Sequence, residues 1–215
     1  MADMAGAPSV EAMRRKHPSA VFCAYVNSTA ETKAHIDICC TSGNVEKVIR
    51  SIPEDREIVF LPDRNLGANM IEKLGRNMIL WDGCCPVHDA VTPGMIAEAR
   101  AAHPAAEVLV HPECRPDVVH AADRALSTGG ILRYVHESPR TEFIIGTEIG
   151  ILHRLRKENP GKVFHPLKPE LVCPDMKKIT LEQVRDALRD GKEEIVLPPE
   201  IMCAARPIEK MIALV

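Results

Sequence analysis

Short apolar runs separated by longer amphipathic segments dominate the first 81 residues of the chain. Apolar runs bounded by turn residues are typical of buried strands, and the segments between them have the periodicity of helices. The pattern predicts strands over 20–25, 36–40, 57–61 and 78–81. It predicts helices over 10–16, 29–35, 43–51 and 65–74, with Ser42 as the cap of the third. Buried strands with helical crossovers indicate a parallel, doubly wound α/β sheet.

The second part of the chain repeats landmarks of the first at an offset of 86 residues. The matching landmarks are His17 and His103, Asp37 and Asp123, Ser42 and Thr128, and Pro53 and Pro139. Further strands are predicted over 107–110 and 143–147, and a register held across so many positions indicates an internal duplication. We therefore expect two repeated three-layer αβα domains, 1–88 and 89–173, each with a short four-stranded parallel sheet.

The last segment, 174–215, does not begin a third repeat, and we expect it to form a helical tail. Thr180 and Gln183 have the spacing of a capping box, which predicts a helix to about Asp190. An apolar stripe follows over 199–214 and is interrupted by Pro207. Such a stripe has to be buried against another surface.

Composition narrows the classes of function. The chain has 215 residues, of which 46% are hydrophobic, so it can build a substantial core. The sequence contains no run of about 18 apolar residues and no basic-then-apolar leader, so we expect no membrane span and a cytoplasmic location. The net charge of −3 and the 3% of aromatic residues argue against a nucleic acid partner. Small-molecule chemistry is the favoured class.

Eight cysteines in a chain without a secretory signal favour metal or thiol chemistry over a disulfide framework. Cys85 and Cys173 stand apart because each follows an apolar run and precedes a proline, which places it at the ligand-binding edge of an open α/β sheet. Cys84 is a weaker candidate for the same role. Cys84 and Cys85 could also form a zinc or redox site, although the chain has no Cys-x-x-Cys pair. The other cysteines are expected in the core or in structural roles: Cys23, Cys39, Cys40, Cys114 and Cys203.

The duplication also pairs polar residues at the ends of strands. Tyr25 and Asn27 of the first repeat fall opposite His111 and Glu113 of the second. Side chains of these types can transfer protons when burial and neighbouring charges adjust their pKa values. The sequence therefore predicts a site to which both repeats contribute.

Ser42 and Thr128 each precede a glycine and are expected to open a helix, where free amides favour a carboxylate or a phosphate. The alternative is that both are ordinary helix caps. His88 either belongs to the same site or stabilises its own turn. The sequence identifies no partner for His17, His103 and His165, which we expect to be structural.

Seven short motifs closely resemble those of the quinolinate synthase family, and they run from the beginning of the chain to its end. They are Tyr25-Val26-Asn27-Ser28-Thr29-Ala30-Glu31, Thr41-Ser42-Gly43-Asn44, Leu61-Pro62-Asp63-Arg64-Asn65-Leu66-Gly67, Cys85-Pro86-Val87-His88, His111-Pro112-Glu113-Cys114, Gly146-Thr147-Glu148 and Cys173-Pro174-Asp175-Met176-Lys177-Lys178-Ile179-Thr180.

The resemblance implies three αβα domains around a [4Fe-4S] cluster, each domain giving one cysteine. Three thiolates can hold such a cluster and leave its fourth iron open as a Lewis acid. It also implies the condensation of iminoaspartate with dihydroxyacetone phosphate to quinolinate, a precursor of NAD, and an aspartate-oxidising enzyme is a candidate partner that supplies iminoaspartate. By match, Cys85 and Cys173 would be cluster ligands. The residues that would line the active site are Tyr25, Asn27, Ser42, His88, His111, Glu113, Ser127 and Thr128, with proton transfer assigned to Tyr25, His111 and Glu113.

The resemblance further implies a whole domain before Met1, because Met1-Ala2-Asp3 resembles the segment that follows the first cluster cysteine in the family. We therefore expect the third cysteine ligand to lie upstream of Met1. Three hypotheses are consistent with these patterns: an incomplete quinolinate synthase, a catalytically inactive two-domain scaffold, and a zinc- or thiol-binding protein.

Overall fold

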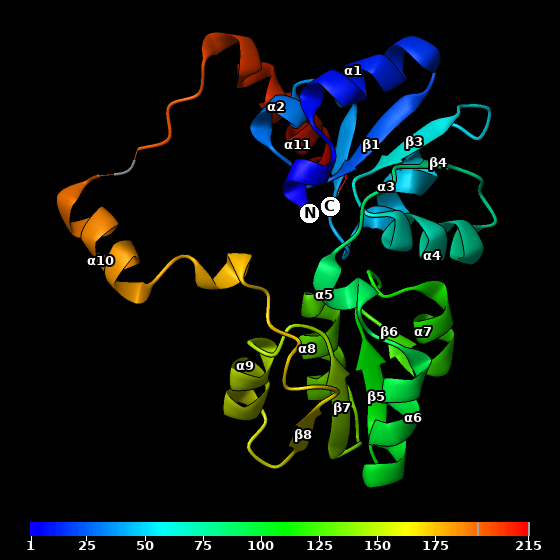
Figure 1. The fold of residues 1–215 in the computed structure, drawn as a ribbon, viewed down its shortest axis with the longest axis vertical. Helices are drawn as coiled ribbons and strands as arrows, with labels where there is room; N and C mark the ends of the chain where they lie inside the picture. Colours follow the sequence, from blue (N-terminus) through cyan, green and yellow to red (C-terminus); the bar gives the residue numbers. More distant parts are fainter. Residues whose placement is uncertain (193, 215) are drawn as a thin grey trace.

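The computed structural model of the protein describes residues 1–192 and 194–214. It contains two parallel four-stranded sheets, which lie one above the other in Figure 1. The first sheet has the order β2-β1-β3-β4 and is formed by β1 (Val21–Tyr25), β2 (Ile38–Cys40), β3 (Ile58–Leu61) and β4 (Ile79–Leu80). The second has the order β6-β5-β7-β8 and is formed by β5 (Glu107–Val110), β6 (Arg124–Ala125), β7 (Glu142–Gly146) and β8 (Val163–Pro166). The predicted α/β fold with two like parallel sheets is confirmed.

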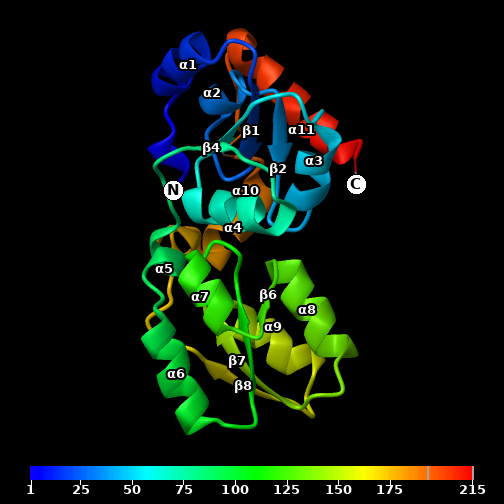
Figure 2. The same ribbon diagram turned by 90° about the vertical axis from the view of Figure 1, so that its right-hand side faces the viewer.

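Helices cover both faces of each sheet. Around the first sheet lie α1 (Ala7–Lys16), α2 (Ala30–Lys33), α3 (Val45–Ser51) and α4 (Arg64–Leu74). Around the second lie α6 (Pro93–Ala102), α7 (Pro116–Ala121), α8 (Thr128–Glu137) and α9 (Ile151–Glu158). The short helix α5 (Pro86–Asp89) lies between the two sheets in both ribbon views (Figures 1 and 2). In the part of the chain that the structure describes, every helix is too short or too polar to cross a membrane.

Strands β1, β2, β3, β5 and β7 are buried almost throughout, which explains their continuous apolar sequences, whereas β4, β6 and β8 are partly exposed. Phe22 of β1 packs with Val10 of α1 on one face of the first sheet, while Cys23 packs on the other face. The second sheet is arranged in the same way. Its β7 directs Ile144 toward a cluster that includes Ile96 of α6, and neighbouring positions of the strand face α8 and α9.

One pair of landmarks predicted from the duplication has the same structural role in both sheets. Asp37 accepts a hydrogen bond from the backbone N–H of Phe22 at 2.8 Å, and Asp123 accepts one from Val108 N–H at 2.7 Å. Each carboxylate also forms an ion pair with an arginine of the preceding long helix. These aspartates therefore fasten the loop before an edge strand to the central strand beside it.

The expected helix start at Gly43, with Ser42 as its cap, is wrong. Helix α3 begins only at Val45, with Asn44 at the N-cap position. Residues 41–44 form a turn in which Thr41 N–H donates to Asn44 Oδ1 at 2.6 Å, so the asparagine binds the turn and Ser42 caps nothing. The predicted elements 29–35, 36–40 and 78–81 are present but shorter, as α2, β2 and β4.

The tail forms helices, as its apolar pattern predicts. Helix α10 (Leu181–Asp190) carries the predicted capping box, and it stands away from both sheets in Figure 1. A 3₁₀ segment, Pro199–Ala204, precedes α11 (Ala205–Ile212), whose first turn accommodates Pro207. Helix α11 packs on the first sheet through Met211, which buries part of the stripe, while Met202 and Ile212 stay exposed. The predicted boundaries 1–88, 89–173 and 174–215 stay a prediction, and residues 193 and 215 of the last segment lie outside the described residues.

Candidate functional site

The carboxyl ends of β1 and β5 meet between the two sheets. Tyr25 is the last residue of β1, and His111 directly follows β5, with Glu113 two residues further. The Tyr25 hydroxyl lies beside the Glu113 carboxylate and the Ser42 hydroxyl, both of which affect its pKa. Polar residues that the duplication paired therefore come together in space, although they are distant in sequence.

His88 of α5 is the centre of a buried hydrogen-bond network. Its Nδ1 lies 2.7 Å from Glu113 Oε2, and its Nε2 lies 2.8 Å from Thr147 Oγ1. The His88 ring stacks on the His111 ring with 4.6 Å between centroids. His111 Nδ1 accepts a hydrogen bond from Glu113 N–H at 3.3 Å. The network joins α5 to the loops that follow β5 and β7.

The surroundings separate the protonation states of the two histidines. Burial alone would lower the pKa of His88, but Cys85 and Glu113 outweigh burial and raise that pKa. Burial also lowers the pKa of His111, to about 4, and its Nδ1 already accepts a hydrogen bond. Burial alone would raise the pKa of Glu113, yet its hydrogen bond to His88 lowers it. The site therefore holds a carboxylate, an imidazolium and a neutral imidazole at neutral pH.

Burial also raises the pKa of Tyr25, and the negative charge of Glu113 raises it further. The phenol is therefore a proton donor rather than a base at neutral pH.

Helix α4 of the first sheet holds the loop that carries Glu113. Asn69 Nδ2 donates to the carbonyls of Pro112 and Cys114, each at 2.8 Å. Asn65 Nδ2 donates to the Glu113 carbonyl at 3.2 Å and to Asp89 Oδ1 at 2.9 Å. Both side chains are buried, and they are four residues apart, so they project from the same face of the helix.

Cys85 is held by a buried aspartate. Asp63 Oδ2 accepts a hydrogen bond from Cys85 N–H at 2.7 Å, while Asp63 Oδ1 accepts one from Leu66 N–H and caps α4. Burial raises the pKa of Asp63 to about 6. The Cys85 thiol lies near His88 and Glu113, and one ligand atom from each of the three lies within 4.8 Å of the others. This donor set could hold a metal ion.

Cys173 lies on a loop at the same side of the molecule as Cys85. Pro86 and Pro174, which directly follow the two cysteines, both line a cleft of about 600 Å³. Both thiols are free and half-buried, so both are open to a ligand. Glu148 helps to shape the second loop, since it accepts a hydrogen bond from Gly150 N–H and pairs with Lys177 at 2.8 Å.

The structure thus clusters some of the predicted site residues and leaves others apart. Tyr25, Ser42, His88, His111, Glu113 and Cys85 belong to one neighbourhood. A Cβ atom at Gly43 would lie 3.5 Å from Ser127 Oγ, so the equivalent turns of the two sheets also face each other. Ser127 acts as the N-cap of α8, and the exposed Thr128 is its first residue. Asn27 is exposed, and among the described residues none hydrogen-bonds its side chain.

The other cysteines largely lie where the sequence pattern predicts. Cys23, Cys39, Cys40 and Cys114 are buried, whereas Cys84 is half-buried beside Cys85. Burial raises the pKa of the Cys39 thiol to about 11. Cys203 is half-buried rather than part of the core, because it lies on the 3₁₀ segment before α11.

Sequence reasoning gave no role to four side chains that organise this site: Asp63, Asn65, Asn69 and Thr147. Three of them belong to motifs already noted, and the fourth, Asn69, follows Asn65 by one helical turn. Asn65 and Asn69 lie on the same face of α4 among apolar residues, and this spacing in the sequence predicts two buried side-chain amides that form hydrogen bonds.

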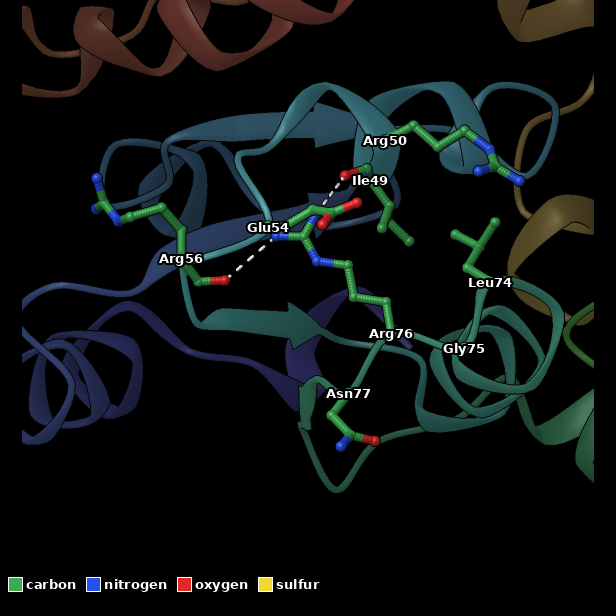
Figure 3. A pocket seen from close by; sticks show the side chains of 8 residues that line it. All are labelled: Ile49, Arg50, Glu54, Arg56, Leu74, Gly75, Arg76 and Asn77. Carbon is green, nitrogen blue, oxygen red and sulfur yellow. Dashed lines mark hydrogen bonds between the residues drawn. The ribbon is translucent and has the colours of Figure 1, made fainter.

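A second cleft, of about 520 Å³, lies at the opposite end of the first sheet (Figure 3). It is lined by three arginines, which suggests an anion site at first sight. However, Arg76 donates to the carbonyls of Ile49, Pro53 and Arg56, and Arg50 pairs with Glu46. The Arg76 guanidinium therefore caps the end of α3 and is not available to a ligand.

Comparison with known proteins identifies the family. The model of the family described as "Quinolinate synthetase A protein" matches residues 1–213. The chain belongs to the quinolinate synthase family. The quinolinate synthase of Methanoregula boonei is 52% identical over 215 residues, which cover 100% of this chain and 71% of that relative. Those of Desulforudis audaxviator and Geobacter metallireducens are 48% and 44% identical, and the match covers 71% and 70% of them.

Membership of the quinolinate synthase family confirms the main functional prediction from sequence. It assigns the chain to an enzyme family of NAD biosynthesis, which generally uses a [4Fe-4S] cluster. The match also runs through both sheets and the tail, so the resemblance is not limited to the seven motifs.

Proposed function

We propose that this chain is part of an enzyme that forms quinolinate from iminoaspartate and dihydroxyacetone phosphate, and that it contributes the site between the carboxyl ends of β1 and β5. The observation that carries the proposal is the buried His88–Glu113 pair, which lies beside Cys85 and faces Tyr25. The reaction releases water and phosphate, so it needs groups that move protons and groups that bind anions. An aspartate-oxidising enzyme would supply the iminoaspartate.

We propose Cys85 and Cys173 as ligands of the family's [4Fe-4S] cluster. Their fit is supported by two free, half-buried thiols on loops that border one cleft. The cluster would supply a Lewis acid for a substrate oxygen. Two thiolates do not complete such a site, so we expect the third cysteine ligand to come from a segment outside residues 1–215.

The protein side chains have separate tasks in this proposal. Glu113, the neutral His111 and Tyr25 are placed for proton transfer, with Glu113 as the group that takes a proton and Tyr25 as a group that donates one. His88 holds the Glu113 carboxylate in position through its 2.7 Å hydrogen bond. Ser42, Ser127 and Thr128 would bind the carboxylates or the phosphate from the facing turns, and Asn27 would orient the substrate.

The proposal can be tested on a form of the chain that is joined to the segment with the third cysteine, by anaerobic reconstitution with iron and sulfide and an assay of quinolinate by mass spectrometry. Dihydroxyacetone phosphate is added directly, and an aspartate-oxidising enzyme generates iminoaspartate. We expect Cys85→Ser and Cys173→Ser to lose the broad visible absorbance of the cluster. Cys203→Ser is the matched control, because that thiol is equally half-buried and lies far along the chain from both loops.

A second comparison tests the acid and base assignment. We expect Glu113→Gln to lower quinolinate formation by at least about 100-fold while the cluster absorbance is kept, since general acid–base groups contribute about 10²–10⁴-fold. Glu98→Gln changes an exposed glutamate of α6 in the same way and should have no effect. Equal rates for Glu113→Gln and the unmodified chain would contradict the proposal.

The geometry also supports a second candidate, a mononuclear zinc site made by Cys85, His88 and Glu113. Donor atoms of these three residues lie within 4.8 Å of one another. Zinc uptake that is lost in His88→Ala, together with a failure to take up iron and sulfide, would favour this candidate over the cluster.

A further inference from the structure

We propose that His103, Glu142 and His165 form a second, independent site for a divalent transition metal ion such as Zn²⁺. His103 precedes β5 and Glu142 begins β7 at the amino end of the second sheet, while the site described above lies at its carboxyl end. His165 is the third residue of β8 and pairs with Ile144, two residues beyond Glu142. The two sites share no side chain, so the metal site stands whether or not the proposed function does.

The three side chains converge from different elements on one face of the sheet. His103 is the C-cap of α6, Glu142 is the first residue of β7, and His165 lies in the edge strand β8. His165 Nε2 lies 2.9 Å from Glu142 Oε1, and His103 Nδ1 lies 3.9 Å from the same oxygen. The two imidazole rings are stacked, with 3.5 Å between centroids.

The donor atoms are close together, but at least one of the two stacked rings has to turn, because an imidazole nitrogen binds a metal in the plane of its ring and two nearly parallel rings cannot both point at one ion. One donor atom from each residue lies within 4.8 Å of the other two. Ligand atoms around tetrahedral zinc, with bonds of about 2.0–2.1 Å, are about 3.3 Å apart. The side chains are between 23% and 35% exposed, so an ion can enter from solvent and the partly open position can keep a water ligand. Two imidazoles and a carboxylate are a donor set that zinc accepts.

The first sheet provides a natural comparison for this cluster. His17 follows α1 as His103 follows α6, and its Nδ1 lies 2.8 Å from Glu57 Oε2. The strand pairing places Val59 opposite Ile79, and in the second sheet it places Ile144 opposite His165. The first sheet therefore has equivalents of His103 and Glu142, namely His17 and Glu57. At the position equivalent to His165 it has Ile79.

A metal ion at this site would connect α6, β7 and β8. Strand β8 is otherwise attached to the sheet along one edge, by its pairing with β7. The chain continues from β8 through Leu167 and Leu171 to the loop of Cys173. The ion would thus fix the strand from which that loop departs, which gives the site a structural role.

The test uses the purified full chain, stripped of metal, with ZnCl₂ and CoCl₂ as probes. We measure zinc stoichiometry and affinity by equilibrium dialysis, and the absorbance of the Co²⁺ form. His165→Ile places the residue of the first sheet at the third position of the second. We expect this variant to lose at least about tenfold in zinc affinity, because removing even an outer-shell partner of a metal ligand costs about 10–100-fold.

All zinc and cobalt measurements use a parent chain with Cys85→Ser, so that the Cys85 thiol cannot bind the metal. The cobalt spectrum tests for any other thiol ligand. Cobalt bound only by imidazole and carboxylate lacks the sulfur charge-transfer absorbance that a Cys85 site would show. His17→Ala removes the equivalent histidine of the first sheet and should leave the zinc affinity unchanged. Ile79→His should create a second zinc site next to His17 and Glu57.

Each result decides for or against the site. Loss of one zinc equivalent in His165→Ile, with binding kept in His17→Ala, supports it. Equal zinc affinity in His165→Ile and the Cys85→Ser parent would overturn it. If His165→Ile fails to fold by circular dichroism, Glu142→Gln gives the same test, since it removes the carboxylate charge and keeps the shape of the side chain.

Discussion

The two hydrogen bonds of Asn69 allow a sharp test of how the site is held in place. Asn69→Asp replaces the donating NH₂ group by an oxygen and leaves the shape of the side chain almost unchanged. In the structure the NH₂ group lies 2.8 Å from two carbonyls, those of Pro112 and Cys114. Two carbonyl acceptors at that distance require the amide nitrogen to face them, because the amide oxygen is not a donor, and the carboxylate of Asn69→Asp offers no donor either.

The expected cost follows from these contacts. Asn69 is 7% exposed, so water cannot replace the lost bonds freely. Two buried hydrogen bonds at about 1 kcal/mol each, together with carbonyls that are left unsatisfied, give a loss of about 2–5 kcal/mol in the free energy of unfolding. That loss would be a large fraction of the stability of an ordinary domain, which is about 5–15 kcal/mol.

The loss at Asn69→Asp should depend on pH. The introduced carboxyl group faces two carbonyl oxygens, so the folded state favours its protonated form and raises its pKa above the value in the unfolded chain. A raised folded pKa contributes stability at low pH that is lost as the pH rises through it. The variant should therefore be closer to the parent at pH 5 than at pH 8.

Urea denaturation followed by circular dichroism and by Trp81 fluorescence measures the effect. Asn77→Asp is the matched control, because it makes the same change at an exposed residue that follows the same helix. The reasoning is refuted if Asn69→Asp and the parent unfold at the same urea concentration at pH 8. Quinolinate formation provides a second readout, since a displaced 112–114 loop would move Glu113.

Two further predictions concern packing and the cysteine loop. A Cβ atom at Gly67 would lie 2.4 Å from Leu80 Cδ2, so Gly67→Ala should cost about 1–2 kcal/mol by overpacking, even after the gain in helix propensity. Gly94→Ala in α6 meets no such obstacle and should stabilise the chain by about 0.5 kcal/mol, and urea titration measures both. Asp63→Asn offers one acceptor oxygen in place of two, so either the Cys85 N–H or the Leu66 N–H loses its acceptor, at a cost of about 1–3 kcal/mol. An unchanged unfolding midpoint and unchanged iron uptake in Asp63→Asn would contradict this account.

Much of the fold was readable from the sequence because its central strands are buried on both faces. The continuous apolar runs of β1, β3 and β5 predict buried strands. The duplication at an offset of 86 residues predicts the second sheet. Two strands, β6 and β8, were missed since one has two residues and the other lies at an edge with a mixed sequence. The start of α3 was wrong because Asn44 and Ser42 are both good capping residues, and only the turn decides between them.

The candidate site was predicted in part. The positions paired by the duplication, Tyr25 with His111 and Asn27 with Glu113, gave three residues of the observed cluster, but Asn27 lies outside it. The sequence could not show that His88 bridges Glu113 and Thr147, since that contact joins helix α5 to two loops that are distant in the sequence. His103 and His165 were expected to be structural, and both belong to the proposed metal site. Their approach to Glu142 joins three separate elements, so it cannot be predicted from the sequence.

Asn65 and Asn69 of α4 make the position of the Glu113 loop in one half of the protein depend on a helix of the other half. The half with the second sheet carries Glu113, the proposed base, and the half with the first sheet carries the asparagines that hold its loop. A rotation of one sheet relative to the other would stretch the hydrogen bonds that Asn65 and Asn69 donate to the 112–114 loop, and it would move Glu113. Separation of the two halves would therefore also displace Glu113 from His88 and Tyr25.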